Sequence, residues 1–570
     1  MARIIHLTVR SEEALPRYVA AVSRVARRLL PDNLPPSEPV IVQGPRTVLA
    51  IVGPGDCLHV RGTNVGAGFL VEPQSTWDRP GNLRPDGAYA LFRSDTDAVE
   101  IVSDSVASRT VWYALTDDLF VASTSQRAIV ALLGGFEFNP EVVTWMIASG
   151  TLGPGHSWDR RIRCLEGASV VRLDRGTWRL QQRSEPVVFR ALDVTSEEHE
   201  RRTLQALRNA VTAAQVADPR WAITLSGGVD SRLILTLLRA TRGLRAVTWG
   251  TRSSPADETS DAAIAARLAA HFGIEHIYFP TDLPRGSAED VLERFVRNGE
   301  GRVDRISGYA DGFSLWQSMV RTGVRGIVRG DEAFGCKLVR SDADVRAETG
   351  MQAWSDHPDL PAPQALDLTP QEWPDFTRPR PGESRETWRD RLYQQYRVPF
   401  LLASLSDLKL GYVEVINPLL CDSVIGVTRQ LPDVLRNDKE LLCRIAQGLS
   451  PAIPFARTNS IETPDQLLRS AQVVEYLLSA LSSADLRYLL PETLIKDVLG
   501  GLMAAPARGS ANLVRHFGDR IRRWRRRFVP VSRRGATRPM RLDGNRRAFR
   551  AYILARMQRM LHSDAHVLPR

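Results

Sequence analysis

The feature that most constrains the fold is a glycine-rich turn at residues 225–231, which reads LSGGVDS. It lies between an apolar segment at 221–225 and a helical pattern at 232–239. Two glycines let a backbone turn tightly and approach an anion, and amides at a helix N-terminus can hold phosphate oxygens. Asp230 would then face a metal ion, because its charge would repel bare phosphate. The turn predicts a phosphate-binding strand–turn–helix unit. Its candidate nucleotide-binding residues are Leu225, Ser226, Gly227, Gly228, Asp230 and Ser231.

The patterns on the two sides of this turn differ and indicate separate domains. Residues 47–173 hold short β-rich pieces separated by Gly, Asp and Pro turns, which predicts a sheet-rich first domain. Further along, strand and helix patterns alternate, which predicts a parallel sheet covered by helices. A length of 570 residues suits two or three domains. We predict domains at 1–185, 196–480 and 481–570, the last of them helical and Arg-rich.

The charge distribution separates one end of the chain from the rest. Residues 515–559 carry sixteen Arg against two Asp, a local charge of +14, so the remainder nets 10 − 14 = −4. Five scattered cysteines form no CxxC pair, which favours a reducing cytoplasm. No apolar run approaches the length of a membrane-spanning helix. We therefore expect a cytoplasmic protein with no membrane contact.

Later motifs give the turn a specific context. The turn resembles the pyrophosphate loop of the N-type ATP pyrophosphatases, and further motifs resemble asparagine-synthetase-like amide-forming enzymes. These motifs are VTWG at 247–250, GDEAFG at 330–335 and EVINPLL at 414–420. The resemblance implies ATP and Mg²⁺ as cofactors, with Asp230 and Asp331 as metal ligands. The residues that it adds to the nucleotide site are Thr248, Trp249, Gly250, Asp261 and Gly330. The catalytic residues that it implies are Asp230, Asp331, Glu332, Glu414 and Arg457.

Several of these positions also have a structural interpretation. Asp261 opens a helix, where the helix dipole favours a carboxylate in any case. Glu414 could equally be the buried partner of an arginine. By the same resemblance, Val328 occupies a position that resembles that of a catalytic acid in asparagine synthetase. Arg457 lies in the segment where related enzymes keep a catalytic lysine. Arg457 is either a fixed cation for the adenylate or a surface residue. We interpret Lys439 as structural, so the sequence identifies no general base.

The first domain resembles the Ntn-type glutaminase half of asparagine synthetase, in segments at 86–89, 103–104 and 122–124. That glutaminase needs a cysteine directly after Met1 as its nucleophile. This chain has Ala2 there, and a methyl group cannot attack an amide. The resemblance therefore implies an α+β glutaminase-like sandwich without its nucleophile, followed by an α/β ATP-pyrophosphatase synthetase domain. The amine would then come from the acceptor and not from glutamine.

A member of this group without the nucleophile resembles lasso peptide cyclases or β-lactam synthetases. We favour the cyclases because of the GDEAFG motif, the NPLL stretch at 417–420 and the SWDR segment at 157–160. Such enzymes adenylate an Asp or Glu side chain of a ribosomally made precursor peptide, whose N-terminal amine then closes a macrolactam. The partners implied are the precursor peptide, a leader peptidase and a leader-binding protein.

Three other functions remain open. The first is a small-molecule amide or β-lactam synthetase. The second is an RNA-modifying ATP pyrophosphatase, for which the basic segment at 521–528 (IRRWRRRF) would bind tRNA. The third is a degenerate binder without activity. The sheet-rich first domain argues against the RNA enzyme, so we do not expect nucleic acid as a partner. Intact Asp230 and Asp331 argue against the degenerate binder.

Overall fold

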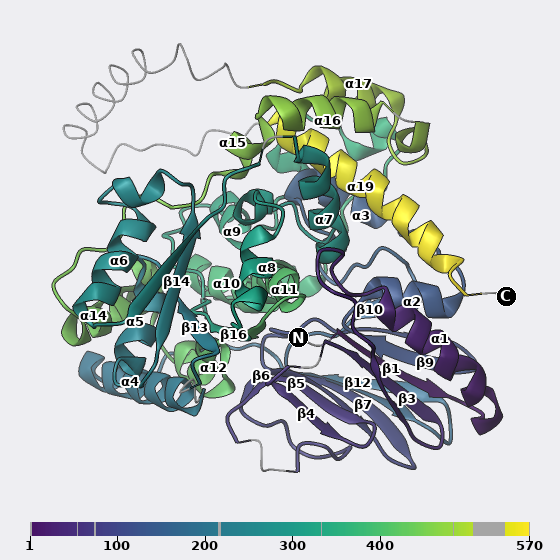
Figure 1. The fold of residues 1–570 in the computed structure, drawn as a ribbon, viewed down its shortest axis with the longest axis horizontal. Coiled ribbons are helices and arrows are strands. Elements are labelled where there is room, and N and C mark those ends of the chain that lie inside the picture. The colour runs from purple at the N-terminus through teal and green to yellow at the C-terminus, as the bar shows by residue number, and fades with distance from the viewer. Residues whose placement is uncertain are drawn as a thin grey trace.

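The chain begins with a sandwich of two antiparallel sheets and continues into a parallel sheet with helices on both faces (Figure 1). The computed structural model describes residues 3–53, 55–72, 76–214, 218–284, 286–331, 333–482, 484–504 and 542–568. This arrangement confirms the predicted fold class. The basic segment at 521–528 lies outside the described residues.

Within the described residues, each sheet of the sandwich has six strands. The first sheet, in spatial order, contains β10 (Arg163–Cys164), β8 (Trp112–Leu115), β9 (Leu119–Ser123), β1 (Arg3–Val9), β3 (Thr47–Val52) and β2 (Val40–Gln43). The second contains β12 (Arg179–Ser184), β11 (Ser169–Asp174), β7 (Ala98–Ser103), β6 (Gly87–Ser94), β5 (Asn64–Leu70) and β4 (Leu58–Arg61). The strand β1, which pairs with both β3 and β9, precedes the region where the sequence predicted strands.

The side chains of β1 alternate between two apolar cores, one on each face of the first sheet. Ile4 packs into the core between the two sheets, whereas Ile5 and Leu7 pack into the core on the outer face. Successive side chains of a strand point to opposite faces, so a run of apolar residues suits a strand that is buried on both. The helices α1 (Leu15–Arg27) and α2 (Gln126–Leu133) cover that outer face.

The second part of the chain, as far as the structure describes it, is built on five parallel strands. Their order is β15 (Glu275–Pro280), β14 (Arg245–Gly250), β13 (Trp221–Thr224), β16 (Gly326–Val328) and β17 (Glu414–Ile416). The central strand β13 is the first along the chain, and the strands that follow it add first on one side and then on the other. Open parallel sheets bind ligands at such a change of direction, beyond the carboxyl ends of the strands.

Helices cover both faces of this parallel sheet. The face that carries Ile223 and Val328 packs in one apolar core with α4, α5, α12 and α14, and the face that carries Ala222 and Ile327 packs with α7, α8 and α11. The bounds are α4 (Ser196–Ala213), α5 (Val229–Leu238), α6 (Asp261–His271), α7 (Ala288–Gly299), α8 (Ser314–Arg321), α11 (Ala403–Leu410), α12 (Asp422–Arg429), α13 (Asp433–Arg436) and α14 (Glu440–Leu449).

A further group of described helices surrounds these two parts. They are α3 (Glu141–Ser149), α9 (Asp342–Thr349), α10 (Arg385–Leu392), α15 (Pro464–Leu468), α16 (Ala471–Leu481), α17 (Glu492–Gly500) and α19 (Gly544–Ala565). The C-terminal helix α19 packs against α2 and α3 of the first part and against α7 and α16 of the second (Figure 1). One apolar core therefore continues from the sandwich to the parallel sheet. The domain limits at 185, 196 and 480 stay predictions.

Candidate active site

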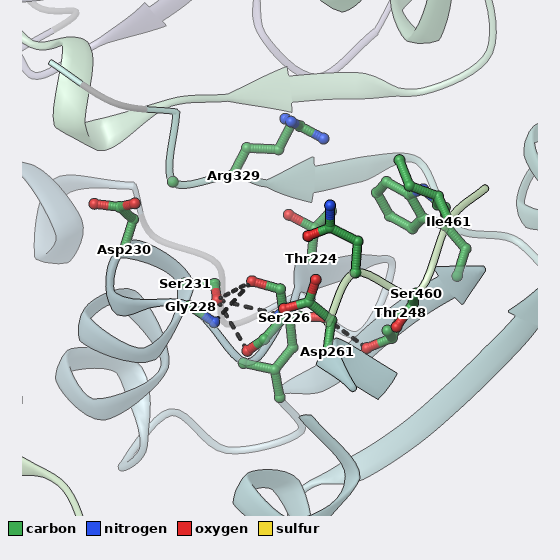
Figure 2. Close-up of a pocket in the computed structure, with 14 residues that line it drawn as sticks. Thr224, Ser226, Gly228, Asp230, Ser231, Thr248, Asp261, Arg329, Ser460 and Ile461 are labelled. Atoms are coloured by element: carbon green, nitrogen blue, oxygen red, sulfur yellow. Dashed lines mark hydrogen bonds between the residues drawn. The ribbon is translucent and has the colours of Figure 1, made fainter. Parts of the chain in front are cut away.

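The glycine-rich turn lies at the carboxyl edge of the central strand. It follows β13 and leads into α5, whose N-terminal cap is Gly228. The Ser226 and Ser231 hydroxyl oxygens lie 3.0 Å apart, and the Gly228 amide donates to Ser226 Oγ at 3.2 Å (Figure 2). These contacts curl the turn so that hydroxyls and the first amides of α5 gather at one point. Such a cluster of donors at a helix N-terminus suits a phosphate group.

The turn forms one wall of a cavity of about 330 Å³. The cavity is lined by Thr224, Leu225, Ser226, Gly228, Asp230, Ser231, Thr248, Trp249, Asp261, Arg329, Gly330, Asn459, Ser460 and Ile461. Most of the nucleotide-binding residues predicted from the sequence thus surround one space, at the point where ligands bind in open parallel sheets. Gly227 and Gly250 are not in its lining but lie directly behind it.

Asp261 positions the turn. Its Oδ1 accepts a hydrogen bond from the Gly227 amide at 3.0 Å, and Ser260 caps the same helix. Burial raises the pKa of Asp261, although its hydrogen bonds act in the opposite direction. The carboxylate lies in the first turn of α6 and also in the cavity wall, so its position fits both interpretations and its role in nucleotide binding stays a prediction.

The opposite wall comes from a segment more than 200 residues further along the chain. The Ala456 amide donates to the Gly227 carbonyl at 3.1 Å, and the Ser460 carbonyl accepts from the Thr251 amide at 2.8 Å. A Cβ at Gly250 would lie 2.3 Å from that Ser460 oxygen. Arg457, in contrast, is exposed and does not line the cavity. The segment that the sequence analysis compared with the catalytic-lysine region of related enzymes thus borders the cavity. The residues through which it does so are Asn459, Ser460 and Ile461, and not Arg457.

Asp230 forms an ion pair with Lys439 in this cavity. Lys439 precedes α14 in the left-handed backbone region, at φ 57°, and its side chain is mostly buried. The interpretation of Lys439 as merely structural missed this contact. The available signal was the rarity of lysine, because the chain has only Lys337, Lys409, Lys439 and Lys496.

Asp331 is held by a neighbouring arginine. Arg329 Nη2 lies 2.8 Å from Asp331 Oδ1, and Arg329 itself lines the cavity. Burial opposes ionisation of Asp331, but the charge and hydrogen bonds of Arg329, with a smaller contribution from the charge of Lys409, together hold the pKa of Asp331 below its ordinary value. Gly330 packs against Asp230, since a Cβ there would lie 2.9 Å from Asp230 Cβ. The two acidic motifs therefore meet at Gly330, with the Asp331 carboxylate engaged by Arg329. Glu332 lies outside the described residues.

Glu414 does not belong to the cavity, which corrects its prediction as a catalytic residue. It opens β17 opposite Gly326, the first residue of β16, and so lies at the amino edge of the parallel sheet. Its Oε2 lies 3.6 Å from Arg109 Nη2 of the sandwich, and Arg109 also donates to the Val415 carbonyl at 2.7 Å. Glu414 is thus the buried partner of an arginine between the two parts of the chain.

A second and larger cavity adjoins the first. Its volume is about 670 Å³, and it shares Trp249, Arg329, Asn459 and Ile461 with the first. Its other lining residues are Arg305, Ser307, Gly308, Tyr309, Trp316, Lys337, Ala347, Glu348, Gln352, Arg397, Leu401, Leu402, Leu405, Lys409, Pro464 and Arg546. Six cations and three aromatic residues are among the twenty residues of this lining. The sequence indicated no such space.

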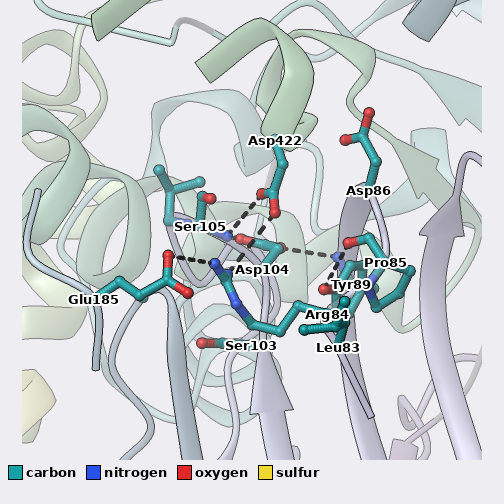
Figure 3. A network of polar contacts seen from close by, with 12 residues as sticks. Leu83, Arg84, Pro85, Asp86, Tyr89, Ser103, Asp104, Ser105, Glu185 and Asp422 are labelled. Carbon is teal, nitrogen blue, oxygen red and sulfur yellow. Dashed lines mark hydrogen bonds and ion pairs between the residues drawn. The ribbon is translucent and has the colours of Figure 1, made fainter. Parts of the chain in front are cut away.

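The segments that resemble the glutaminase make contacts between domains. Asp104 Oδ2 accepts from the Tyr89 amide at 2.8 Å, and the Ser105 amide donates to Asp422 of α12 at 3.1 Å (Figure 3). Arg84 pairs with Glu185 at 2.8 Å on the same side. Two further contacts reach α12: Arg84 Nη1 lies 3.8 Å from Asp422, and the Ser423 amide donates to Asp86 at 3.2 Å, so this side of the sandwich is joined to the parallel-sheet unit.

The cysteine nearest in sequence to the N-terminus is also no candidate nucleophile. Cys57 is buried, and burial raises the pKa of its thiol far above its ordinary value. Since a thiolate and not a thiol is the nucleophile, this residue is inert. Within the described residues, no group of three or more His, Cys, Asp or Glu side chains is placed to hold a metal ion, and no helix is long and apolar enough to cross a membrane.

Comparison with known proteins agrees with the geometry of the parallel-sheet unit. Residues 202–409 match the family model for asparagine synthase. No curated protein sequence matches the chain. Among solved structures, glutamine phosphoribosylpyrophosphate amidotransferase from B. subtilis, complexed with ADP and GMP, matches at 9% identity and a TM-score of 0.19. That match covers 58% of this chain and 75% of the other. The turn at 225–231 and Asp331 lie within the matched range, so residues 202–409 are an asparagine synthase domain and the chain is an ATP-dependent carbon–nitrogen ligase.

Proposed function

We propose that this enzyme closes a macrolactam in a ribosomally made precursor peptide. The peptide's Asp or Glu side-chain carboxylate attacks the α-phosphate of ATP, and pyrophosphate leaves. The peptide's N-terminal amine then attacks the acyl carbon, and AMP leaves. The observation that carries this proposal is the second cavity, about 670 Å³ against about 330 Å³, which adjoins the nucleotide pocket and is twice its size.

The nucleotide pocket has the donors that the first step requires. The Ser226 and Ser231 hydroxyls and the amides at the start of α5 would bind the pyrophosphate oxygens. Thr248 and Trp249 would line the adenosine side, where Thr248 Oγ1 is held by the Leu225 carbonyl at 2.6 Å. These groups orient ATP so that its α-phosphate can meet a carboxylate.

A divalent cation fits the carboxylate end of this pocket. Asp230 lines the pocket, and the Lys439 ammonium at its carboxylate marks a place where positive charge is stabilised. Mg²⁺ commonly binds through one or two carboxylates together with substrate phosphates. When bound, it would neutralise the phosphate charge that develops as pyrophosphate leaves. Asp230 would bind the cation. Asp331 would become a second ligand only if its carboxylate released Arg329, with which it forms an ion pair.

The source of the amine supports an intramolecular reaction. The chain has Ala2 where a glutaminase needs its cysteine, and Cys57 is buried and protonated. Ammonia from glutamine is therefore not expected, and the substrate must bring its own amine. A peptide that carries both the carboxylate and the amine meets this requirement, with a leader peptidase to free the amine and a leader-binding protein to deliver the peptide.

A small-molecule amide or β-lactam synthetase is the second candidate. A cavity of about 670 Å³ lies within the usual range for small ligands, and its cations suit an amino-acid-derived acid. Both candidates use the same ATP chemistry and differ in the size of the acyl substrate.

The test is mass spectrometry of a precursor peptide from the neighbouring open reading frames. The peptide is incubated with ATP, Mg²⁺, this enzyme and the leader protease and leader-binding protein of the same locus. We expect the core peptide to lose one water, with AMP formed in equal amount. If the leader is removed and the core stays unchanged, the macrolactam proposal is wrong. Turnover of amino-acid-derived acids in a parallel assay would then support the second candidate.

A further inference from the structure

Lys409 differs from the other three lysines in its surroundings. Lys337, Lys439 and Lys496 each pair with a carboxylate: Glu348, Asp230 and Glu492. Lys409, on α11, is only 5% exposed and forms no ion pair within the described part of the chain. Its Nζ donates to the Leu405 carbonyl at 2.6 Å. A buried amine without a counter-charge is costly as a cation, so the neutral form is favoured.

Within the described residues, the groups that contact Lys409 directly supply no formal counter-charge. Its Nζ lies 5.7 Å from the Tyr309 ring centroid, and the Tyr309 hydroxyl donates to the same Leu405 carbonyl at 3.0 Å. That carbonyl is therefore shared between two donors. Burial lowers the pKa of Lys409 well below its ordinary value, and the charge of Arg329 lowers it further.

Carboxylates near Lys409 are already engaged by arginines. Asp331 and Asp407 oppose the lowering of its pKa, but Asp331 pairs with Arg329 and Asp407 pairs with Arg302. The charged residues around the rest of the cavity are Arg305, Lys337, Glu348, Arg397 and Arg546. They comprise four cations and one acid, so the cavity as a whole disfavours a further positive charge.

The cavity connects Lys409 with the nucleotide pocket. Both spaces are lined by Trp249, Arg329, Asn459 and Ile461, and Lys409 lines the larger one. An amine held in the larger cavity would reach an acyl group activated in the smaller one past these shared residues. An amine that approaches the acyl carbon from there passes along the wall that carries Lys409.

We propose that Lys409 is the general base of amide formation. The step rests on the proposed function, in which an amine attacks an acyl-adenylate. As the amine nitrogen bonds to the acyl carbon, the acyl–oxygen bond to AMP breaks and AMP leaves with the electron pair. The nitrogen becomes positively charged, and its proton passes to the neutral Nζ of Lys409, which becomes an ammonium. This assigns the base that the sequence did not identify.

The experiment separates proton removal from adenylation. Wild type, Lys409→Met and Lys409→Arg are given ATP, Mg²⁺ and the carboxylate substrate that turns over in the assay above, with or without hydroxylamine. Hydroxylamine is unprotonated at neutral pH and captures an acyl-adenylate as a hydroxamate without a base. Lys496→Met, which removes an exposed lysine on α17, is the matched control.

We expect both Lys409 variants to form hydroxamate within about twofold of wild type. Their amide formation should fall by about 100-fold or more, the usual contribution of a general base. Wild-type amide formation should rise with pH through the pKa of Lys409, whereas hydroxamate formation should lack that rise. The pH profiles need no variant and so remain decisive if a substitution at this buried site prevents folding.

Other results would overturn the assignment. Full activity of Lys409→Arg would show that a fixed cation is sufficient, and equal loss of amide and hydroxamate would place Lys409 in adenylation or substrate binding. Unchanged amide formation by Lys409→Met would exclude a role altogether. If wild type forms neither product from any acid tested, the proposed function itself fails, which is a distinct outcome.

Discussion

Single carboxylates in this protein acquire their roles from the charges beside them. Asp230 and Asp331 lie in neighbouring motifs, yet Asp230 faces the cavity with Lys439 and Asp331 is held by Arg329. Glu414, from a third acidic motif, lies at the opposite edge of the sheet. Residue type and motif therefore did not separate these three acids, whereas their positions and partners distinguish the two beside the cavity from the one between the domains.

Removal of the Asp230 carboxylate should abolish turnover without unfolding the protein. We expect Asp230→Asn to lower pyrophosphate release by about 100-fold or more, because a cavity charge that stabilises the transition state is lost. Pyrophosphate release and the thermal midpoint are measured together. Asp290→Asn, at an exposed carboxylate on α7, should leave both unchanged. Substantial activity of Asp230→Asn would refute its role as a metal ligand.

Asp104 should make stability depend on pH in an unusual direction. Burial raises its pKa from 3.8 to about 6, against the hydrogen bonds from Ser108 and the Val106 amide. Because the folded protein binds this proton more tightly than the unfolded chain, the stabilisation is complete below pH 4 and is lost as the pH rises through 6. The shift corresponds to about 3 kcal/mol at most.

The comparison with Asp104→Asn isolates this effect, since the amide does not titrate. Wild type should gain stability relative to the variant as the pH falls from 7 to 4, measured by thermal unfolding. Asp97→Asn, at an exposed carboxylate of the same domain, provides the baseline. A difference between wild type and Asp104→Asn that stays constant over this range would contradict the raised pKa.

At the scale of elements, the glycine-rich turn depends on the segment that packs behind it. A Cβ at Gly227 would lie 2.4 Å from Ala456 Cβ and 3.0 Å from Ile264 Cβ. At the neighbouring Gly228, the closest atom is Ser226 Oγ at 3.3 Å. The two adjacent glycines thus differ, because only Gly227 is needed for close packing between the turn, α6 and the segment at 456–461.

This difference predicts a matched pair of variants. Gly227→Ala should displace the turn and weaken ATP binding by at least about tenfold, as misplaced phosphate donors lose their geometry. Gly228→Ala keeps its amide and its ordinary φ of −81°, so its affinity should stay close to that of wild type. Binding of ATP is measured by calorimetry. Equal affinities of the two variants would show that the packing behind Gly227 is not required.

The strength of local patterns determined which elements could be predicted. The strand–turn–helix unit from β13 to α5 has an apolar strand, two glycines and a helical pattern, all within twenty residues. The π-helix at Tyr393–Leu402, in contrast, contains Pro399 and follows a region that is rich in Pro and Asp. Such a helix depends on packing and not on propensity, since a proline in a helix interior is costly by itself.

For the molecule as a whole, α19 connects the two domains through a buried ion pair. Arg550 Nε lies 2.7 Å from Asp304 Oδ2, and each side chain is only 2% exposed. Arg550 also donates to the carbonyls of Ile147 and Ala148, at the end of α3. The C-terminal helix is therefore part of the common core and not an appendage.

Loss of this pair should destabilise the whole protein. Arg550→Met leaves the buried Asp304 carboxylate with only the longer contact to Arg305, at 3.7 Å, and removal of one partner of a buried pair typically costs about 3–5 kcal/mol. Urea unfolding measures the change, and Arg559→Met, at an exposed residue of the same helix, is the control. Adding Asp304→Leu should restore part of the loss, since no buried charge remains. A small effect of Arg550→Met would mean that α19 contributes little to the common core.

Local sequence was sufficient for the strand and helix pattern and for the glycine-rich turn, because these depend on hydrophobic period and glycine spacing over short stretches. The asparagine synthase domain was indicated by the resemblance of its short motifs to that family. Lys439 beside Asp230, the wall from 459 to 461 and the second cavity with Lys409 were beyond the reach of local sequence. These residues lie more than 170 positions from the turn along the chain. They meet it only because the order of parallel strands and the packing of helices on the sheet bring distant segments to one edge.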